Sequence, residues 1–165
     1  MGPASDAASA YERYGPALVR KARRMLGSDD DARDIVQGLF VDLMQKHVRG
    51  GDRALELPYL YRAVTNRCLN LLRDSRNRQR LLEDHAPEQP ARSRLDDRVI
   101  GVDLLARLAE RLDARSLEIL VCLYVDDMTQ EETATLLEVS RRTIGKRLGR
   151  ARAALAAIAG EEDAS

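Results

Sequence analysis

The stretch TQEETATLLEVSRRTIGKRLGRARAAL, residues Thr129–Leu155, is typical of a helix-turn-helix. Thr129 is followed three residues later by Glu132, the spacing of a capping box, which predicts that a helix begins there. Val139 closes this first segment, and Ser140 is a favourable N-cap for a second helix. We therefore expect two helices separated by a short turn.

The second helix of this stretch has an apolar stripe and a basic face. On a helical wheel of about 100° per residue, its large apolar side chains fall on one side, which we expect to face a core. They are Ile144, Leu148, Ala151 and Leu155. The other side is basic, and no carboxylate occurs from residue 140 to residue 152. Such a helix can enter a major groove and bind guanine edges and phosphates.

An ordinary surface helix with solvated charge is the simpler interpretation of a basic run. The distribution of charge along the chain argues against it. The 165 residues include 27 basic and 27 acidic side chains, but residues 116–139 contain no Lys or Arg. The first 80 residues are net basic, the middle of the chain is acidic, and residues 140–165 are basic again. Charge segregated in this way produces a directional field on one element, not a general attraction to nucleic acid.

Three further amphipathic helices are expected in the first half of the chain. The first spans residues 10–26 and is closed by Gly27, a suitable C-cap. The second begins at Ser28 and Asp29, which are good N-caps, and buries one strongly apolar face. Its opposite side is acidic, and is either plain solvent surface or a contact for a basic partner. The third follows a loop marked by two glycines and has Pro58 in its first turn.

The third of these helices carries a second basic surface. Asp74 is the only acidic residue between Arg62 and Arg80. Tyr59 and Tyr61 lie at the start of the helix, where aromatic rings beside arginines can stack on an unpaired base. The alternative is that both rings simply pack against the fold, and both interpretations remain open.

The predicted fold class is all-α, with two small helical domains joined by a flexible linker. The first domain spans residues 8–80. Residues 81–97 contain Pro87 and Pro90 without hydrophobic periodicity, and we assign them as the linker. The second domain spans residues 98–158 and ends in the helix-turn-helix.

Two helices are expected ahead of the helix-turn-helix, over residues 99–112 and 116–125. Their inward-facing residues include Leu105, Leu108 and Tyr124. These side chains would supply the core against which the last two helices pack.

Neither enzyme chemistry nor a metal site is indicated. Cys68 and Cys122 lie among apolar neighbours without a third thiol or a histidine pair, so we expect reduced core residues. His47 and His85 have no evident partner for acid–base work, and no glycine-rich phosphate loop follows a strand. We therefore expect no catalytic residue and no cofactor. No apolar run reaches the roughly 20 residues of a membrane span and no signal peptide precedes the first helix, which predicts a cytoplasmic protein without membrane insertion.

These features together resemble bacterial RNA polymerase sigma factors of the extracytoplasmic function group, in the sigma-70 superfamily, over residues 11–158. The segment DARDIVQGLF at residues 31–40 is similar to the polymerase-binding helix of that group. The resemblance implies that Asp31, Asp34 and Gln37 contact the clamp helices of the largest polymerase subunit.

Two further segments carry the resemblance toward DNA. Residues 59–66, YLYRAVTN, are similar to the helix that reads the −10 element and melts the promoter, and residues 49–56 would form the pocket for a flipped base. The −10 and melting residues so implied are Tyr59, Tyr61, Arg62, Asn66, Arg73 and Arg76. Residues 140–151 are similar to the helix that reads the −35 element. The DNA contacts implied there are Arg141, Arg142, Thr143, Lys146, Arg147 and Arg150.

The chain departs from the pattern of this group at several positions. Tyr59 stands where tryptophan is usual, which keeps an aromatic surface of smaller area. Asn70 replaces a common aspartate, and Thr133 occupies a position that is usually apolar. Glu138 occupies the turn position usually held by glycine. If the backbone there is left-handed, Glu138 costs on the order of 1 kcal/mol.

The leading hypothesis is a promoter-specificity subunit with no chemistry of its own. It would bind core RNA polymerase, read two separated elements of duplex promoter DNA and nucleate melting. Sigma factors of this group are often held inactive by an anti-sigma factor, and the sequence does not identify one. A conventional helix-turn-helix repressor or activator is the alternative, and it leaves the second basic surface and the acidic helix face unexplained.

Overall fold

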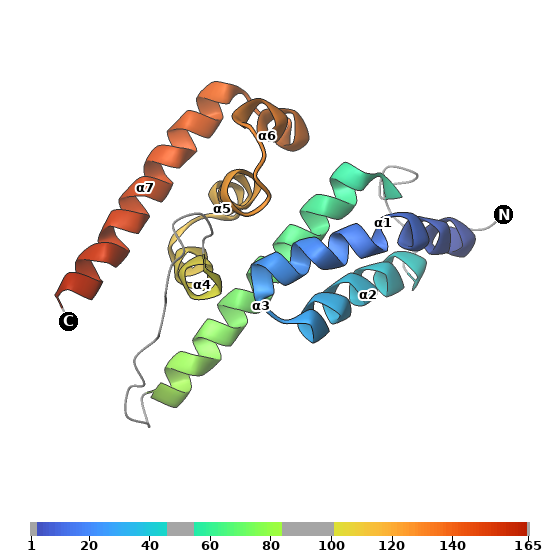
Figure 1. Ribbon diagram of the computed structural model, residues 1–165, viewed down its shortest axis with the longest axis horizontal. Helices are drawn as coiled ribbons and strands as arrows, with labels where there is room; N and C mark the ends of the chain where they lie inside the picture. The colour runs from blue at the N-terminus through green and yellow to red at the C-terminus, as the bar shows by residue number, and fades with distance from the viewer. Residues whose placement is uncertain (1–2, 46–54, 84–100, 165) are drawn as a thin grey trace. The chain divides into compact units, whose positions relative to one another are not determined.

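The computed structural model describes residues 3–45, 55–83 and 101–164, and within these ranges every regular element is helical (Figure 1). The expected all-α class is therefore confirmed. The elements are α1 (Pro3–Leu26), α2 (Asp29–Gln45), α3 (Leu57–Glu83), α4 (Val102–Arg111), α5 (Ala114–Leu120), the π-helical turn η2 (Val121–Val125), α6 (Gln130–Leu137) and α7 (Arg141–Asp163).

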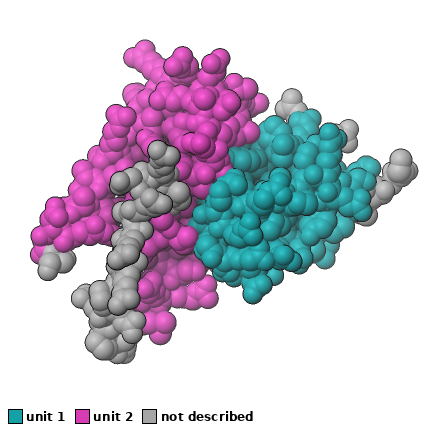
Figure 2. Space-filling model, in the orientation of Figure 1, with its two compact units in different colours: residues 1–68 teal, residues 69–165 magenta. Residues whose placement is uncertain are grey.

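The chain divides into two compact units, residues 1–68 and residues 69–165, and the boundary falls inside α3 (Figure 2). The first half of α3 therefore belongs to unit 1 and the second half to unit 2. The predicted linker, residues 81–97, lies mostly outside the described residues, as does most of the predicted base pocket. Residues 81–83 are helical and form the last turn of α3.

Unit 1 is built on the pair α1 and α2, joined by Gly27 and Ser28. Gly27 has a positive φ of 69°, and its N–H donates to the Arg23 carbonyl at 2.8 Å, as a C-cap should. The Ser28 hydroxyl accepts the N–H of Asp31 at 3.2 Å, so the expected N-cap is also present. Helix α1 begins earlier than expected because Ala7 continues its buried stripe. The core of unit 1 includes Leu18, Ala22, Met25, Val36, Leu39, Phe40, Leu60, Val64 and Cys68.

Unit 2 is organised around α7, which packs against α4, α5 and α6. Its buried stripe is Ile144, Leu148, Ala151 and Ile158. Facing core residues include Leu105, Leu108, Leu117, Leu120 and Leu137. The capping box at the start of α6 is formed as predicted, because Thr129 Oγ1 accepts the Glu132 N–H at 3.1 Å and the Glu132 carboxylate accepts the Thr129 N–H at 2.9 Å.

The prediction that Tyr124 faces inward is wrong, since its side chain is 48% exposed. The cause is the π-helical turn Val121–Val125, which is wider than an α-helical turn. The Asp126 N–H donates to the Val121 carbonyl five residues earlier, at 2.9 Å. This change of register buries Cys122 and Val125 and turns Tyr124 outward.

The turn between α6 and α7 requires a left-handed residue, and that residue is Glu138, with φ 54° and ψ 45°. The Val139 N–H donates to the Ala134 carbonyl at 3.0 Å, and the Glu138 N–H points to the Thr135 carbonyl at 3.4 Å. This is the Schellman arrangement that usually employs glycine. The polar residue at 133 is accommodated too, since the buried Thr133 hydroxyl donates to the Thr129 carbonyl at 2.8 Å.

Replacing the left-handed residue by glycine is expected to stabilise unit 2. Glu138→Gly should raise the free energy of unfolding by about 1 kcal/mol, because a Cβ clashes with the backbone in the left-handed conformation. Urea unfolding followed by circular dichroism measures the change. Glu138→Ala is the matched control, since it removes the carboxylate and keeps the Cβ. An equal gain in Glu138→Ala would assign the effect to charge and contradict the strain.

Candidate nucleic-acid interface

The N-terminal half of α7 presents a basic surface. Ser140 caps the helix, because its hydroxyl accepts the Thr143 N–H at 3.1 Å. Burial of the stripe at Ile144, Leu148 and Ala151 fixes which side of the helix faces outward. Four of the six expected DNA contacts are exposed; Arg142, Lys146 and Arg150 lie on that outward side, and Arg141 lies at its flank.

The other two expected contacts are arranged differently. Thr143 is half-buried, with its hydroxyl 3.0 Å from the Ser140 hydroxyl. Arg147 is half-buried and forms an ion pair with Asp113, the residue before α5. Arg147 therefore ties α7 to the start of α5.

Asp113 is held ionised by its surroundings. Burial by itself would raise the pKa of the Asp113 carboxyl, but the hydrogen bond from the Ser116 hydroxyl at 2.6 Å and the charge of Arg147 oppose it. The net result is a pKa below the ordinary value of 3.8. The ion pair with Arg147 therefore persists to lower pH than an aspartate with an ordinary pKa would allow.

The first half of α3 separates the two tyrosines that the sequence left ambiguous. Tyr59 is 49% exposed. Arg62 and Asn66 are half-buried and follow it at spacings of three and four, which places all three on one face of the helix. Tyr61 lies toward α1, with its ring centroid 3.8 Å from the Lys21 Nζ. Only one of the two aromatic rings is therefore part of the outward face.

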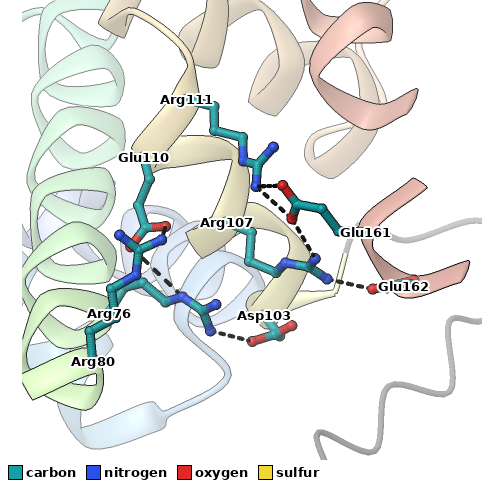
Figure 3. Close-up of polar contacts among 8 residues, drawn as sticks. All are labelled: Arg76, Arg80, Asp103, Arg107, Glu110, Arg111, Glu161 and Glu162. Atoms are coloured by element: carbon teal, nitrogen blue, oxygen red, sulfur yellow. Dashed lines mark hydrogen bonds and ion pairs between the residues drawn. The ribbon is translucent and has the colours of Figure 1, made fainter. Parts of the chain in front are cut away.

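Three arginines in the second half of α3 contact α4, within unit 2, and Figure 3 shows two of them, Arg76 and Arg80. Arg73 Nε donates to the Ala109 carbonyl at 2.7 Å. Arg76 lies 3.5 Å from Asp103 and 3.7 Å from Glu110, and Arg80 donates to Glu110 at 2.8 Å. We call this group the α3–α4 cluster; its members are Arg73, Arg76, Arg80, Asp103, Ala109 and Glu110. Two expected DNA contacts, Arg73 and Arg76, are thus engaged by protein groups in this structure.

Helix α4 also forms ion pairs with the C-terminal end of α7. Arg111 donates to both carboxylate oxygens of Glu161, at 2.6 and 2.7 Å, and Arg107 pairs with Glu162 (Figure 3). The hydrogen bond from Arg111 lowers the pKa of the Glu161 carboxyl. Helix α4 therefore offers acidic side chains to α3 and basic side chains to α7.

The acidic face of α2 is available at its N-terminal end. Asp31, Asp34 and Gln37 are all exposed and recur at spacings of three, so they follow one side of the helix. Gln37 also lines a shallow groove between α1 and α2. Asp42, further along, instead binds Arg67 of α3 at 2.6 Å. The outward-facing charge is thus concentrated where the polymerase contacts were expected.

The described ranges contain no group of three or more His, Cys, Asp or Glu side chains arranged to hold a metal ion. Cys68 and Cys122 are buried and are not joined in a disulfide, as expected of reduced core residues. None of the helices in the described ranges is long and apolar enough to span a bilayer.

Sequence reasoning missed three residues that shape these surfaces. Lys21 is buried beneath Tyr61, Asp113 holds Arg147, and Glu110 holds Arg76 and Arg80. Each acts on a residue at least 30 positions away in the chain. Of these three residues, only Lys21 could have been recognised from its neighbours in the sequence, as a lysine on an otherwise apolar stripe.

Two family models and several known proteins are similar to this chain. The family described as Sigma-70 region 2 matches residues 10–78, and the family described as Sigma-70, region 4 matches residues 103–155. RNA polymerase sigma factor CnrH from Cupriavidus metallidurans is 31% identical, over 88% of this chain and 82% of CnrH. RNA polymerase sigma-E factor from Streptomyces coelicolor is 31% identical, over 84% of this chain and 77% of that protein.

A solved structure is also similar, that of the sigma factor RpoE in complex with the anti-sigma factor NepR from Bartonella quintana. It is 21% identical over 88% of this chain and 91% of that chain, with a TM-score of 0.43. This chain belongs to the sigma-70 family, in the extracytoplasmic function group, and is a promoter-specificity subunit of bacterial RNA polymerase.

Proposed function

We propose that this sigma factor acts in the cytoplasm by docking on core polymerase through α2, reading the −35 element with α7, and reading and melting the −10 element with the first half of α3. The single observation that carries the proposal is the exposed basic face of α7, which begins at a capped N-terminus. Helix N-termini and arginine side chains both favour phosphate, and arginine also pairs with guanine.

The outward side of α7 and the side that packs toward α5 have different proposed roles. Arg142, Lys146 and Arg150 lie on the outward side and are assigned to bases and phosphates of the −35 element. Arg147 is assigned to positioning, because its ion pair with Asp113 holds α7 at a fixed place on α5. Thr143, whose hydroxyl lies beside that of Ser140, supports the cap from which the helix starts.

The outward face of α3 suits an unpaired strand. Tyr59 offers an exposed ring for stacking on a base, and Arg62 and Asn66 follow on the same side of the helix. Stacking and hydrogen bonds of this kind recover the few kcal/mol that unstacking a base costs.

Arg73 and Arg76 are assigned to the melted strand only after the α3–α4 cluster opens. In the cluster, Arg73 donates to a backbone carbonyl and Arg76 lies between two carboxylates. Contact with phosphate therefore requires exchange of these partners. The free chain is then a weaker ligand for single-stranded DNA than its basic residues suggest.

The decisive experiment asks whether the purified chain co-elutes with sigma-free core polymerase and directs transcription from a library of genomic promoter fragments. Co-elution and initiation at a defined subset of fragments are the expected results, and the subset reveals both elements. Failure to bind core, with retained affinity for duplex DNA, would instead support a conventional helix-turn-helix regulator.

Substitutions in α7 and α3 should separate the two recognition steps. Arg142→Ala and Lys146→Ala should each weaken binding to the upstream element about tenfold and lower the salt dependence by about one phosphate contact. Asn66→Ala should impair melting and leave duplex binding intact. Filter binding at several salt concentrations and permanganate footprinting of holoenzyme complexes measure these effects. Equal loss of duplex binding in all three variants would contradict two separate elements.

Charge reversal on α2 should weaken docking on the polymerase. Asp34→Lys is expected to reduce affinity for core at least about tenfold. The new lysine would face the basic surface to which the acidic side of α2 is proposed to bind, and like charges at an interface cost several kcal/mol. Asp74→Lys, at an exposed position of α3, is the matched control for the change in net charge. Competition against labelled wild-type chain for core measures both. Undiminished binding by Asp34→Lys would place the docking face elsewhere.

Loosening the α3–α4 cluster should raise affinity for single-stranded DNA. Glu110→Gln removes the carboxylate shared by Arg76 and Arg80, and about threefold tighter binding of a −10 oligonucleotide is expected from loss of such partly exposed pairs. Glu161→Gln is the matched control. It neutralises a carboxylate of α7 that pairs with Arg111 of α4, and it leaves Arg76 paired. An equal gain in both variants would mean that only net charge changed.

A further inference from the structure

One charged side chain in unit 1 is buried almost completely. Lys21 on α1 is 2% exposed, among the large side chains that are least accessible in the described chain. Taking an ammonium group out of water is costly unless other groups stabilise it. The groups around the Lys21 ammonium must therefore stabilise its charge.

The aromatic ring of Tyr61 covers this ammonium group. Lys21 Nζ lies 3.8 Å from the ring centroid, well within the range of a cation–π contact, and 3.9 Å from the Met25 sulfur. Within α3 itself, the buried Thr65 hydroxyl donates to the Tyr61 carbonyl at 3.0 Å. The contact between Lys21 and Tyr61 thus fastens the first turns of α3 to α1.

The position of Tyr61 determines where Tyr59 points. Two residues apart on a helix lie on nearly opposite faces, so a Tyr61 ring directed at α1 leaves Tyr59 on the outward side. The exposed fraction of Tyr59, 49%, agrees with this. Rotation of α3 about its axis would move the face that carries Tyr59, Arg62 and Asn66 away from its outward position.

We propose that Lys21 is a positioning residue for promoter melting, which holds Tyr61 by its ring and thereby directs Tyr59 toward the flipped base. Tyr61 itself does not stack on DNA. The inference rests on the proposed role of the first half of α3 and refines it: one tyrosine anchors the helix and the other stacks.

The test uses holoenzyme reconstituted with full-length chain and a promoter fragment, found by the transcription experiment, that carries 2-aminopurine in its −10 element. The rise in fluorescence on unstacking gives the rate of opening. Lys21→Met and Tyr61→Leu should each slow opening about tenfold, the effect of losing one desolvated cation–π contact. The double variant should be no slower than either single variant, and Tyr61→Phe, which keeps the ring, should open like the wild type.

Two controls separate positioning from stability. Affinity for core should be unchanged in every variant. Leu18→Ala, which removes a buried side chain one turn earlier on α1, should lower the stability of unit 1 without slowing opening to the same extent. Equal slowing in Leu18→Ala would reduce the role of Lys21 to stability and overturn the proposal.

Other outcomes are equally clear. If Lys21→Met opens the promoter at the wild-type rate and Tyr61→Leu opens it slowly, Tyr61 stacks on DNA directly and the proposal is wrong. If Lys21→Met does not fold, comparison of Tyr61→Phe with Tyr61→Leu tests the proposal instead. Equal slowing of promoter opening in both variants would exclude a role for the Tyr61 ring over the Lys21 ammonium. If the wild-type chain binds core but the resulting holoenzyme opens no promoter, both the proposed function and this refinement of it are contradicted.

Discussion

Burial of one narrow stripe of α7 is the constraint on which unit 2 depends. Ile144, Leu148 and Ala151 occupy the stripe at the N-terminal end, and Ile158 continues it. Helices α4, α5 and α6 are held together largely by packing against this surface. A helix can bury only one side in a layer of this kind, so its basic residues must either face outward or find a partner. The orientation of the recognition surface follows from the packing of the opposite side.

Charge pairing then divides the arginines into two populations. One faces outward on α7, at Arg142 and Arg150. The other joins helices, as when Arg147 binds Asp113 and Arg76 lies between two carboxylates of α4. Partly buried cations require such partners because desolvation is costly. A count of arginines along a helix therefore overstates how many reach DNA, because residues of α4 and the residue before α5 hold several of them.

Much of the fold could be predicted because the controlling interactions are local. The capping box at Thr129, the cap at Ser140 and the left-handed turn at Glu138 join groups within a few residues of each other. Apolar periodicity similarly identified three of the four buried residues of the α7 stripe, Ile144, Leu148 and Ala151. Tyr124 was misplaced because a π-helical turn changes the register, and no pattern of apolar spacing announces such a turn.

By itself the sequence determined the helices, their caps and the basic side of α7, since periodicity and capping depend on neighbours in the chain. Tertiary structure alone decided which of the charged and aromatic side chains are turned inward. The partners of Arg80 and Arg147 lie 30 and 34 residues away. The ring over Lys21 belongs to a different helix. Contacts between distant segments exist only after packing brings them together, so only the folded chain distinguishes a structural cation from one that faces DNA.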